Sequence, residues 1–133
     1  MKIRDIMSTP AHTIGPEATL MQAWSLMELH RIRHLPVVEA GKVVAILSDD
    51  DVKAAMAPGK PSKPASTDGL DVLKVREHAT HAAVCIGPDE RLPRAANLMR
   101  QRRIGCLPVV NGEKLLGIVT ATDLLDRMGR HSR

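Results

Sequence analysis

An internal duplication constrains this chain more than any other feature. When the sequence is shifted by 72 positions, which moves residue 51 onto residue 123, residues 3–52 align with residues 75–124 without a gap. The identical pairs lie along the whole run and include Ile14 and Ile86, Leu35 and Leu107, Pro36 and Pro108, and Asp51 and Asp123. Because a single register holds so many identities, the chain consists of two related halves.

Each half shows the same succession of predicted elements. A Gly-Pro turn leads into an amphipathic helix, two strands with a tight connection, and a second helix. The predicted ranges are helix 17–30, strands 34–38 and 42–47 and helix 49–56, then helix 89–102, strands 106–110 and 114–119 and helix 121–128. A half of about 55 residues buries too little surface to be reliably stable alone. We therefore expect an α+β fold in which two β-α-β-β-α repeats pack sheet to sheet with pseudo-twofold symmetry.

The same patterns predict the domain boundaries. We expect a first repeat at residues 1–56, a flexible linker rich in Pro, Gly and Ser at 57–71, a second repeat at 72–128, and a basic tail at 129–133. A chain of 133 residues with 44% apolar residues has enough material for one shared core.

Composition argues against several classes of function. The net charge of +4 is a mild excess, and Trp24 is the sole aromatic residue, so nucleic-acid binding is poorly supported. No run of about 18 apolar residues exists to cross a membrane, and the charged N-terminus lacks a signal-peptide pattern. Cys85 and Cys106 form no metal or disulfide motif and are interpreted as small buried apolar residues. We predict a soluble cytoplasmic protein that does not bind membranes.

Two strand-to-helix turns carry the strongest local pattern. Thr120 and Asp123 have the spacing of a capping box at a helix N-terminus, and Ser48 and Asp51 repeat it in the first half. The unpaired N–H groups of a helix N-terminus can hold an anion, while a carboxylate can accept hydrogen bonds from a diol. The pattern predicts either a simple helix cap or a cap that also faces a ligand.

Several motifs, in order and repeated, resemble the tandem cystathionine-β-synthase (CBS) domain pair, known as a Bateman module. The resemblance rests on Arg4-Asp5-Ile6-Met7, on Leu35-Pro36-Val37-Val38 with Leu107-Pro108-Val109-Val110, and on Gly117-Ile118-Val119-Thr120-Ala121-Thr122-Asp123. The last run fits the Gly-x-x-Thr/Ser-x-x-Asp nucleotide signature of that family. The match covers both halves and omits only the linker and the tail.

The resemblance implies a regulatory module that binds AMP, ADP, ATP or S-adenosylmethionine in a cleft between the repeats and signals to a separate effector protein. In the family, the Asp of the signature binds the ribose, the Thr or Ser faces the phosphate, and apolar residues hold the adenine. Carried over, the second-half site is Ile86, Ile104, Leu107, Pro108, Thr120 and Asp123, and the first-half site is Ile14, Ile32, Leu35, Pro36, Ser48 and Asp51.

The two predicted sites differ in charge. The first half has Ala45 in place of the signature glycine, and Asp49 and Asp50 add negative charge beside Asp51. Close carboxylates repel a phosphate, so we expect the second-half site to be the better nucleotide site. The first-half site is then empty, takes a ligand without phosphate, or needs a divalent cation. His34 is interpreted first as an ordinary strand histidine, and the alternative is that its titration tunes this site with pH.

The sequence shows no sign of catalysis. The histidines have no metal-binding spacing, and no nucleophile–base pair is visible, so we predict neither an enzyme nor a metal or cofactor. The first helix carries extra apolar residues such as Leu26 and Leu29, and the first helix of the second half adds Leu98. Together with the resemblance, these residues predict a homodimer. The alternatives are a structural dimerisation module with empty clefts and a weak nucleic-acid binder.

Overall fold

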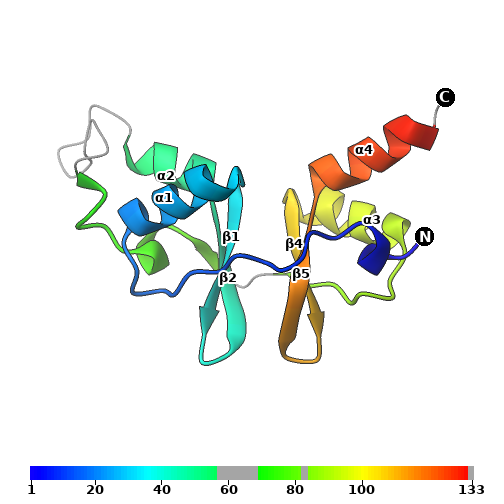
Figure 1. Cartoon of the computed structure of the whole chain (residues 1–133), viewed down its shortest axis with the longest axis horizontal. Helices are drawn as coiled ribbons and strands as arrows, with labels where there is room; N and C mark the ends of the chain where they lie inside the picture. The colour runs from blue at the N-terminus through cyan, green and yellow to red at the C-terminus, as the bar shows by residue number, and fades with distance from the viewer. Residues whose placement is uncertain (57–68, 82–83, 132–133) are drawn as a thin grey trace. The chain divides into compact units, whose positions relative to one another are not determined.

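The computed structural model describes residues 1–56, 69–81 and 84–131, and it divides into two compact units (Figure 1). Unit I comprises His12–Ala82, and unit II comprises Met1–Ala11 together with Ala83–Arg133. Each unit combines helices with a small antiparallel sheet, which confirms the predicted α+β class. Residues 57–68 of the predicted linker at 57–71 and the last two residues of the predicted tail lie outside the described residues.

The described part of unit I has a three-stranded sheet and two α-helices. Its elements are α1 (Leu20–His30), β1 (His34–Glu39), β2 (Lys42–Ser48), α2 (Asp49–Ala55), the 3-10 turn η3 (Val75–Glu77) and β3 (Thr80–His81). The sheet order is β1-β2-β3, and both pairs are antiparallel. Ile14 adds one parallel bridge to Val37, at the place of the predicted first strand.

Unit II repeats this organisation. Its elements are the 3-10 turn η1 (Ile3–Asp5), α3 (Leu92–Arg102), β4 (Cys106–Asn111), β5 (Lys114–Thr120) and α4 (Ala121–His131). β4 and β5 pair antiparallel, and Ile86 bridges in parallel to Val109, as Ile14 does in unit I. The four main strands agree with the predicted ranges to within one residue at each end.

The helix ends differ from the prediction for local reasons. α1 begins at Leu20 because Thr19 and Gln22 form a capping box, with Thr19 Oγ1 accepting from the Gln22 N–H at 3.1 Å. α3 begins at the equivalent place, with a proline in its first turn. α4 continues to His131, so the first part of the predicted basic tail is helical.

Each unit has its own apolar core. Leu20, Leu35 and Leu47 are fully buried in unit I, and Leu107 and Val119 are fully buried in unit II. Leu70, which the sequence assigned to the linker, is also fully buried in the core of unit I. Leu98 belongs to the core of unit II, whereas Leu29 on α1 is 74% exposed.

The leading segments of the two halves are exchanged between the units. Residues 1–8 open the first half in sequence, yet they pack in unit II, where Ile3 is fully buried. The Ile3 N–H donates to the Glu90 carbonyl at 2.9 Å, and Ser8 exchanges backbone hydrogen bonds of 2.8 and 3.1 Å with Ile118. The chain therefore builds unit II from its two ends.

The segment that opens the second half makes the equivalent contacts in unit I. Val75 is fully buried there, and its N–H donates to the Ala18 carbonyl at 2.9 Å. Further along, Thr80 pairs with Ile46 in the β2–β3 ladder. A repeat in sequence and a unit in space therefore contain different residues.

An ion pair provides a direct test of this exchange. The Arg4 side chain donates to Asp89 Oδ1 from Nε at 2.9 Å and from Nη2 at 2.6 Å. These hydrogen bonds lower the pKa of the Asp89 carboxyl.

We expect Arg4→Gln to raise the pKa of Asp89 towards its usual range, as measured by carboxyl NMR chemical shifts across a pH titration. Arg76→Gln, at the equivalent position in unit I, should leave Asp89 unchanged; an Asp89 titration insensitive to Arg4→Gln would contradict the packing of residues 1–8 on unit II.

Candidate ligand-binding site

The second-half turn forms the predicted capping box. The Thr120 N–H donates to Asp123 Oδ2 at 2.8 Å, and the Asp123 N–H donates to Thr120 Oγ1 at 3.2 Å. Asp123 is half-buried, and no hydrogen bond reaches its Oδ1 within the part of the chain that the structure describes. One carboxylate oxygen thus holds the helix cap, and the other remains able to accept hydrogen bonds from a ligand.

The strand register separates the predicted apolar residues into two groups. In the β4–β5 ladder Pro108 lies opposite Ile118, and Cys106 lies opposite Thr120, so all four side chains are on one face. Leu107 and Ile86 belong to the core of unit II on the other side. Pro108 and Thr120 therefore share a face beside Asp123, whereas Leu107 and Ile86 primarily stabilise the unit.

Ile104 lies between these groups. It is half-buried, packs against the core of unit II, and its N–H donates to the Met99 carbonyl at 3.0 Å, just before β4 begins. The next turn is fixed by the Ala121 N–H, which donates to the Gly105 carbonyl at 2.9 Å. The start of β4 and the start of α4 are consequently held together.

The first-half residues have the same arrangement in unit I. The Ser48 N–H donates to Asp51 Oδ2 at 2.8 Å, and the Asp51 N–H donates to Ser48 Oγ at 3.1 Å. Pro36 lies on the face that carries Ser48. Ile14 and Leu35 belong to the core of unit I, and Ile32 is half-buried against it.

The residue opposite the cap differs between the halves. His34 pairs with Ser48 in the β1–β2 ladder, and Cys106 pairs with Thr120 in the β4–β5 ladder. Burial lowers the pKa of His34, although the three carboxylates of α2 act in the opposite direction. Burial raises the pKa of the Cys106 thiol to about 12. Cys106 is buried, as the sequence predicted, but its place across from Thr120 follows only from the strand register.

Gly117 lies against residues 8–9, which come from the other end of unit II. A Cβ at this position would collide with the Ser8 carbonyl oxygen and lie 2.8 Å from Thr9 Cγ2. The absence of a side chain therefore lets residues 8–9 cross β5. In unit I the equivalent Ala45 is fully buried and pairs with His81 of β3. The glycine–alanine difference between the halves therefore follows the packing of the leading segments.

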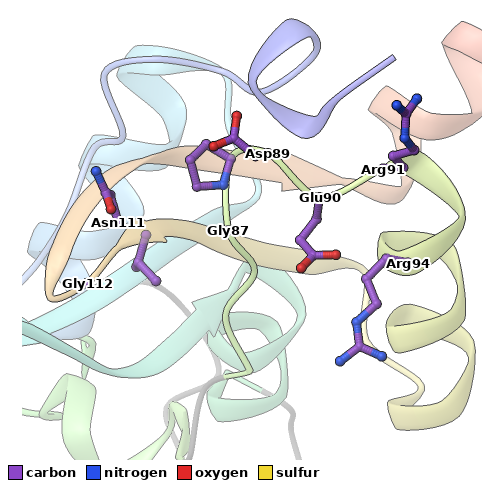
Figure 2. Close-up of a pocket in the computed structure, with 9 residues that line it drawn as sticks. Gly87, Asp89, Glu90, Arg91, Arg94, Asn111 and Gly112 are labelled. Carbon is purple, nitrogen blue, oxygen red and sulfur yellow. The ribbon is translucent and has the colours of Figure 1, made fainter.

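Two cavities among the described residues lie mostly away from the predicted site residues. One, of about 390 Å³, is in unit II, where the start of α3 meets the β4–β5 hairpin (Figure 2). None of the six predicted second-half residues lines it, Arg91 and Arg94 point in different directions, and Asp89 is paired with Arg4. A second cavity, of about 550 Å³, runs along α1 in unit I and includes Ile14 of the predicted set.

The described residues contain no cluster of three or more His, Cys, Asp or Glu side chains arranged to hold a metal ion. No helix among them is long and apolar enough to span a membrane.

Comparison with known families decides what this arrangement is. The sequence profile of the CBS domain matches residues 3–58 and again residues 75–130. The chain is a pair of CBS domains. This family assignment agrees with the resemblance read from the sequence motifs, and the CBS pair is a regulatory module.

Known CBS proteins resemble the chain over most of its length. The CBS domain-containing protein YhcV of Bacillus subtilis is 32% identical over 122 residues, which cover 92% of this chain and 81% of YhcV. The crystal structure of the CBS domain pair of protein MJ0100, in complex with 5′-methylthioadenosine and S-adenosyl-L-methionine, matches with a TM-score of 0.83 and 27% identity, over 100% of this chain and 98% of that one.

Enzymes also match, but over a small part of their length. An inosine-5′-monophosphate dehydrogenase of Methanocaldococcus jannaschii is 32% identical over 128 residues, which cover 95% of this chain and 23% of the enzyme. The similarity therefore does not extend to the remaining three quarters of that enzyme.

Proposed function

We propose that this CBS pair binds an adenosine-containing ligand beside each capping box and signals its presence to a separate effector protein. The observation that carries the proposal is the half-buried Asp123 carboxylate, whose Oδ2 is engaged by the helix cap while Oδ1 has no partner among the described residues. An ionised carboxylate oxygen in this position can accept from a ribose hydroxyl. The likeness to the MJ0100 pair, which was crystallised with two adenosine derivatives, supports the same ligand class.

The two sites are expected to prefer different ligands. Ala121 and Thr122 between Thr120 and Asp123 are neutral, whereas Asp49 and Asp50 occupy the equivalent positions in unit I. Like charges at close range in a partly buried site cost a few kcal/mol, so a phosphate is repelled from the first-half site. We therefore assign AMP, ADP or ATP to the second-half site and a ligand without phosphate to the first-half site.

Substituting the two aspartates tests both assignments. Asp123→Asn keeps one oxygen for the helix cap but replaces the other with an NH2 group, which donates hydrogen bonds and cannot accept one. We expect AMP or ATP binding to weaken about tenfold to a hundredfold in isothermal titration calorimetry, the usual loss for a hydrogen bond to a charged group. Asp51→Asn should leave AMP and ATP binding unchanged and weaken S-adenosylmethionine binding instead. Asp126→Asn, an exposed residue on α4, is the control. Equal losses of AMP binding from both test variants would contradict the preference.

Ligand binding should also raise the stability of the CBS pair. A ligand at a hundred times its dissociation constant stabilises the folded state by about 2.7 kcal/mol. A thermal melt with no shift for any adenosine ligand would favour the alternative of a structural module with empty sites.

We further infer that the CBS pair forms a homodimer through its helices. Large apolar side chains are exposed on α1 and α4, where Leu29 is 74%, Leu125 is 65% and Met128 is 63% exposed. Apolar side chains grouped on a helix surface favour a protein partner. Sedimentation velocity of the wild type and of Leu29→Glu tests this. The cytoplasmic location and the absence of nucleic-acid binding, of a cofactor and of catalysis stay predictions.

A further inference from the structure

We propose that His34 makes the first-half site of the CBS pair sensitive to protons, so that the site holds a cationic adenosine ligand while the imidazole is neutral and releases it when the imidazole is protonated. The inference rests on the proposed function, because it concerns the ligand of one of the two proposed sites. It names the ligand class, a nucleoside with a positive charge, and the residue that regulates its binding.

The position of His34 follows from the strand register. His34 begins β1 and lies directly across from Ser48, the cap residue of α2. The Asp49 N–H donates to the Arg33 carbonyl at 2.9 Å, which joins the start of β1 to the start of α2. The half-buried imidazole is therefore held beside the first turn of α2, next to the capping box that forms the proposed site.

The charges around His34 come from two segments. The first turn of α2 contributes the carboxylates of Asp49, Asp50 and Asp51, and all three interact electrostatically with the imidazole. Arg33 acts against them, and Lys53 pairs with Asp49 at 3.6 Å. Three carboxylates thus exceed the two cations by one negative charge while the imidazole is neutral. Protonation of His34 cancels that excess.

The excess negative charge around neutral His34 favours a cationic ligand over one that carries a phosphate. A negative site attracts a cation and repels a phosphate, and the attraction is stronger in a partly buried site than in water. S-adenosylmethionine carries a permanently positive sulfonium, whereas 5′-methylthioadenosine is the corresponding neutral thioether. The two molecules share the nucleoside and therefore separate the contribution of charge from that of adenosine recognition.

The sign of the pH dependence follows from the environment of His34. Because burial dominates and lowers the pKa of His34, the imidazole is neutral near pH 7 and gains its proton only on the acid side of its usual value of about 6.5. At the equivalent place in unit II, the pKa of Cys106 is raised to about 12, so this thiol stays uncharged over the same range. The second half is thus an internal control without a titrating group opposite its cap.

The test uses the full chain carrying Asp123→Asn, which weakens the second-half site and leaves the first-half site as the main one. We expect calorimetric titration with S-adenosylmethionine to show affinity falling about fivefold to tenfold between about pH 7 and pH 5, as one added positive charge near the ligand predicts. Binding of 5′-methylthioadenosine should stay the same across this range.

Matched variants assign the effect to His34. His34→Cys introduces the residue that the second half has at this position, and His34→Gln is a polar replacement in case the thiol variant folds poorly. Either substitution should abolish the pH dependence of S-adenosylmethionine binding. His30→Gln removes another histidine of unit I, whose ring stacks on His12 at a centroid distance of 3.6 Å, and should retain the pH dependence.

The outcomes separate the inference from the function on which it rests. Equal S-adenosylmethionine affinity at both pH values, or a pH dependence that persists in both His34 variants, overturns the inference and leaves adenosine binding intact. If neither S-adenosylmethionine nor 5′-methylthioadenosine binds at either pH, the first-half assignment fails, and the inference fails with it. Binding of AMP to the wild-type chain in that same experiment would still support the second-half site.

Discussion

Replacing Gly117 with alanine is expected to destabilise the CBS pair by about 3 kcal/mol, at the upper end of what overpacking costs in a tightly packed region. The new methyl group would collide with the backbone oxygen of Ser8, which cannot move aside as a flexible side chain can. Ser8 is also held by two backbone hydrogen bonds to Ile118, so relief of the collision would break this pairing. Urea unfolding followed by circular dichroism measures the loss.

A second glycine in unit II is the matched control. Gly105 lies just before β4, its backbone does not require a positive φ angle, and no atom lies within 4 Å of a Cβ built on it. Gly105→Ala should therefore change stability by less than about 0.5 kcal/mol, as substitutions away from tight contacts usually do. Equal unfolding curves for Gly117→Ala and Gly105→Ala would show that residues 8–9 do not cross β5 at this distance.

Truncating Ile3 to alanine should cost about 3 kcal/mol, the usual range for removing a large aliphatic side chain from a core being roughly 2–5 kcal/mol. This result is expected although residues near a chain terminus commonly tolerate substitution. Ile3 is fully buried in the core of unit II, and its N–H donates to the Glu90 carbonyl. The free energy of unfolding from urea titration measures the effect.

The duplication again offers an internal comparison. Val75 is the counterpart of Ile3 in unit I and is also fully buried, but it has one methylene group fewer, so Val75→Ala should cost less. Val72→Ala replaces a side chain that is 74% exposed and should be nearly neutral. If Ile3→Ala were as mild as Val72→Ala, residues 1–8 would not be part of the core of unit II.

Local sequence patterns were sufficient to predict the helices, the main strands and the capping boxes. The Thr120–Asp123 and Ser48–Asp51 spacings predicted capping boxes, and the structure forms both because the groups that bond are only three residues apart. The main strands also followed from short apolar runs between turns. Helix α1 began later than the apolar pattern suggested, because Thr19 and Gln22 fix its first residue.

The strand register was needed to tell which predicted site residues point into the core and which share a face with the helix cap. Apolar residues next to each other in a strand point to opposite faces, so Leu107 lines the core while Pro108 shares a face with Thr120. The sequence named both as adenine contacts, since a family motif does not distinguish the two faces. For the same reason Cys106 was identified only as a buried residue, and its position opposite the cap was missed.

The sequence by itself determined that this chain is a duplicated CBS pair with two capping boxes of unequal charge. The identities between the two halves and the three-residue spacing of the cap residues depend only on the order of residues along the chain. Only the tertiary structure decided which residues complete each unit, why position 117 is glycine, and which side chain lies opposite each cap. These features depend on contacts between segments far apart in the chain, such as Ser8 with Ile118 and His34 with Ser48. Such contacts produce no periodic pattern in the sequence, because packing and strand register, and not the neighbouring residues in the chain, determine which residue lies opposite which.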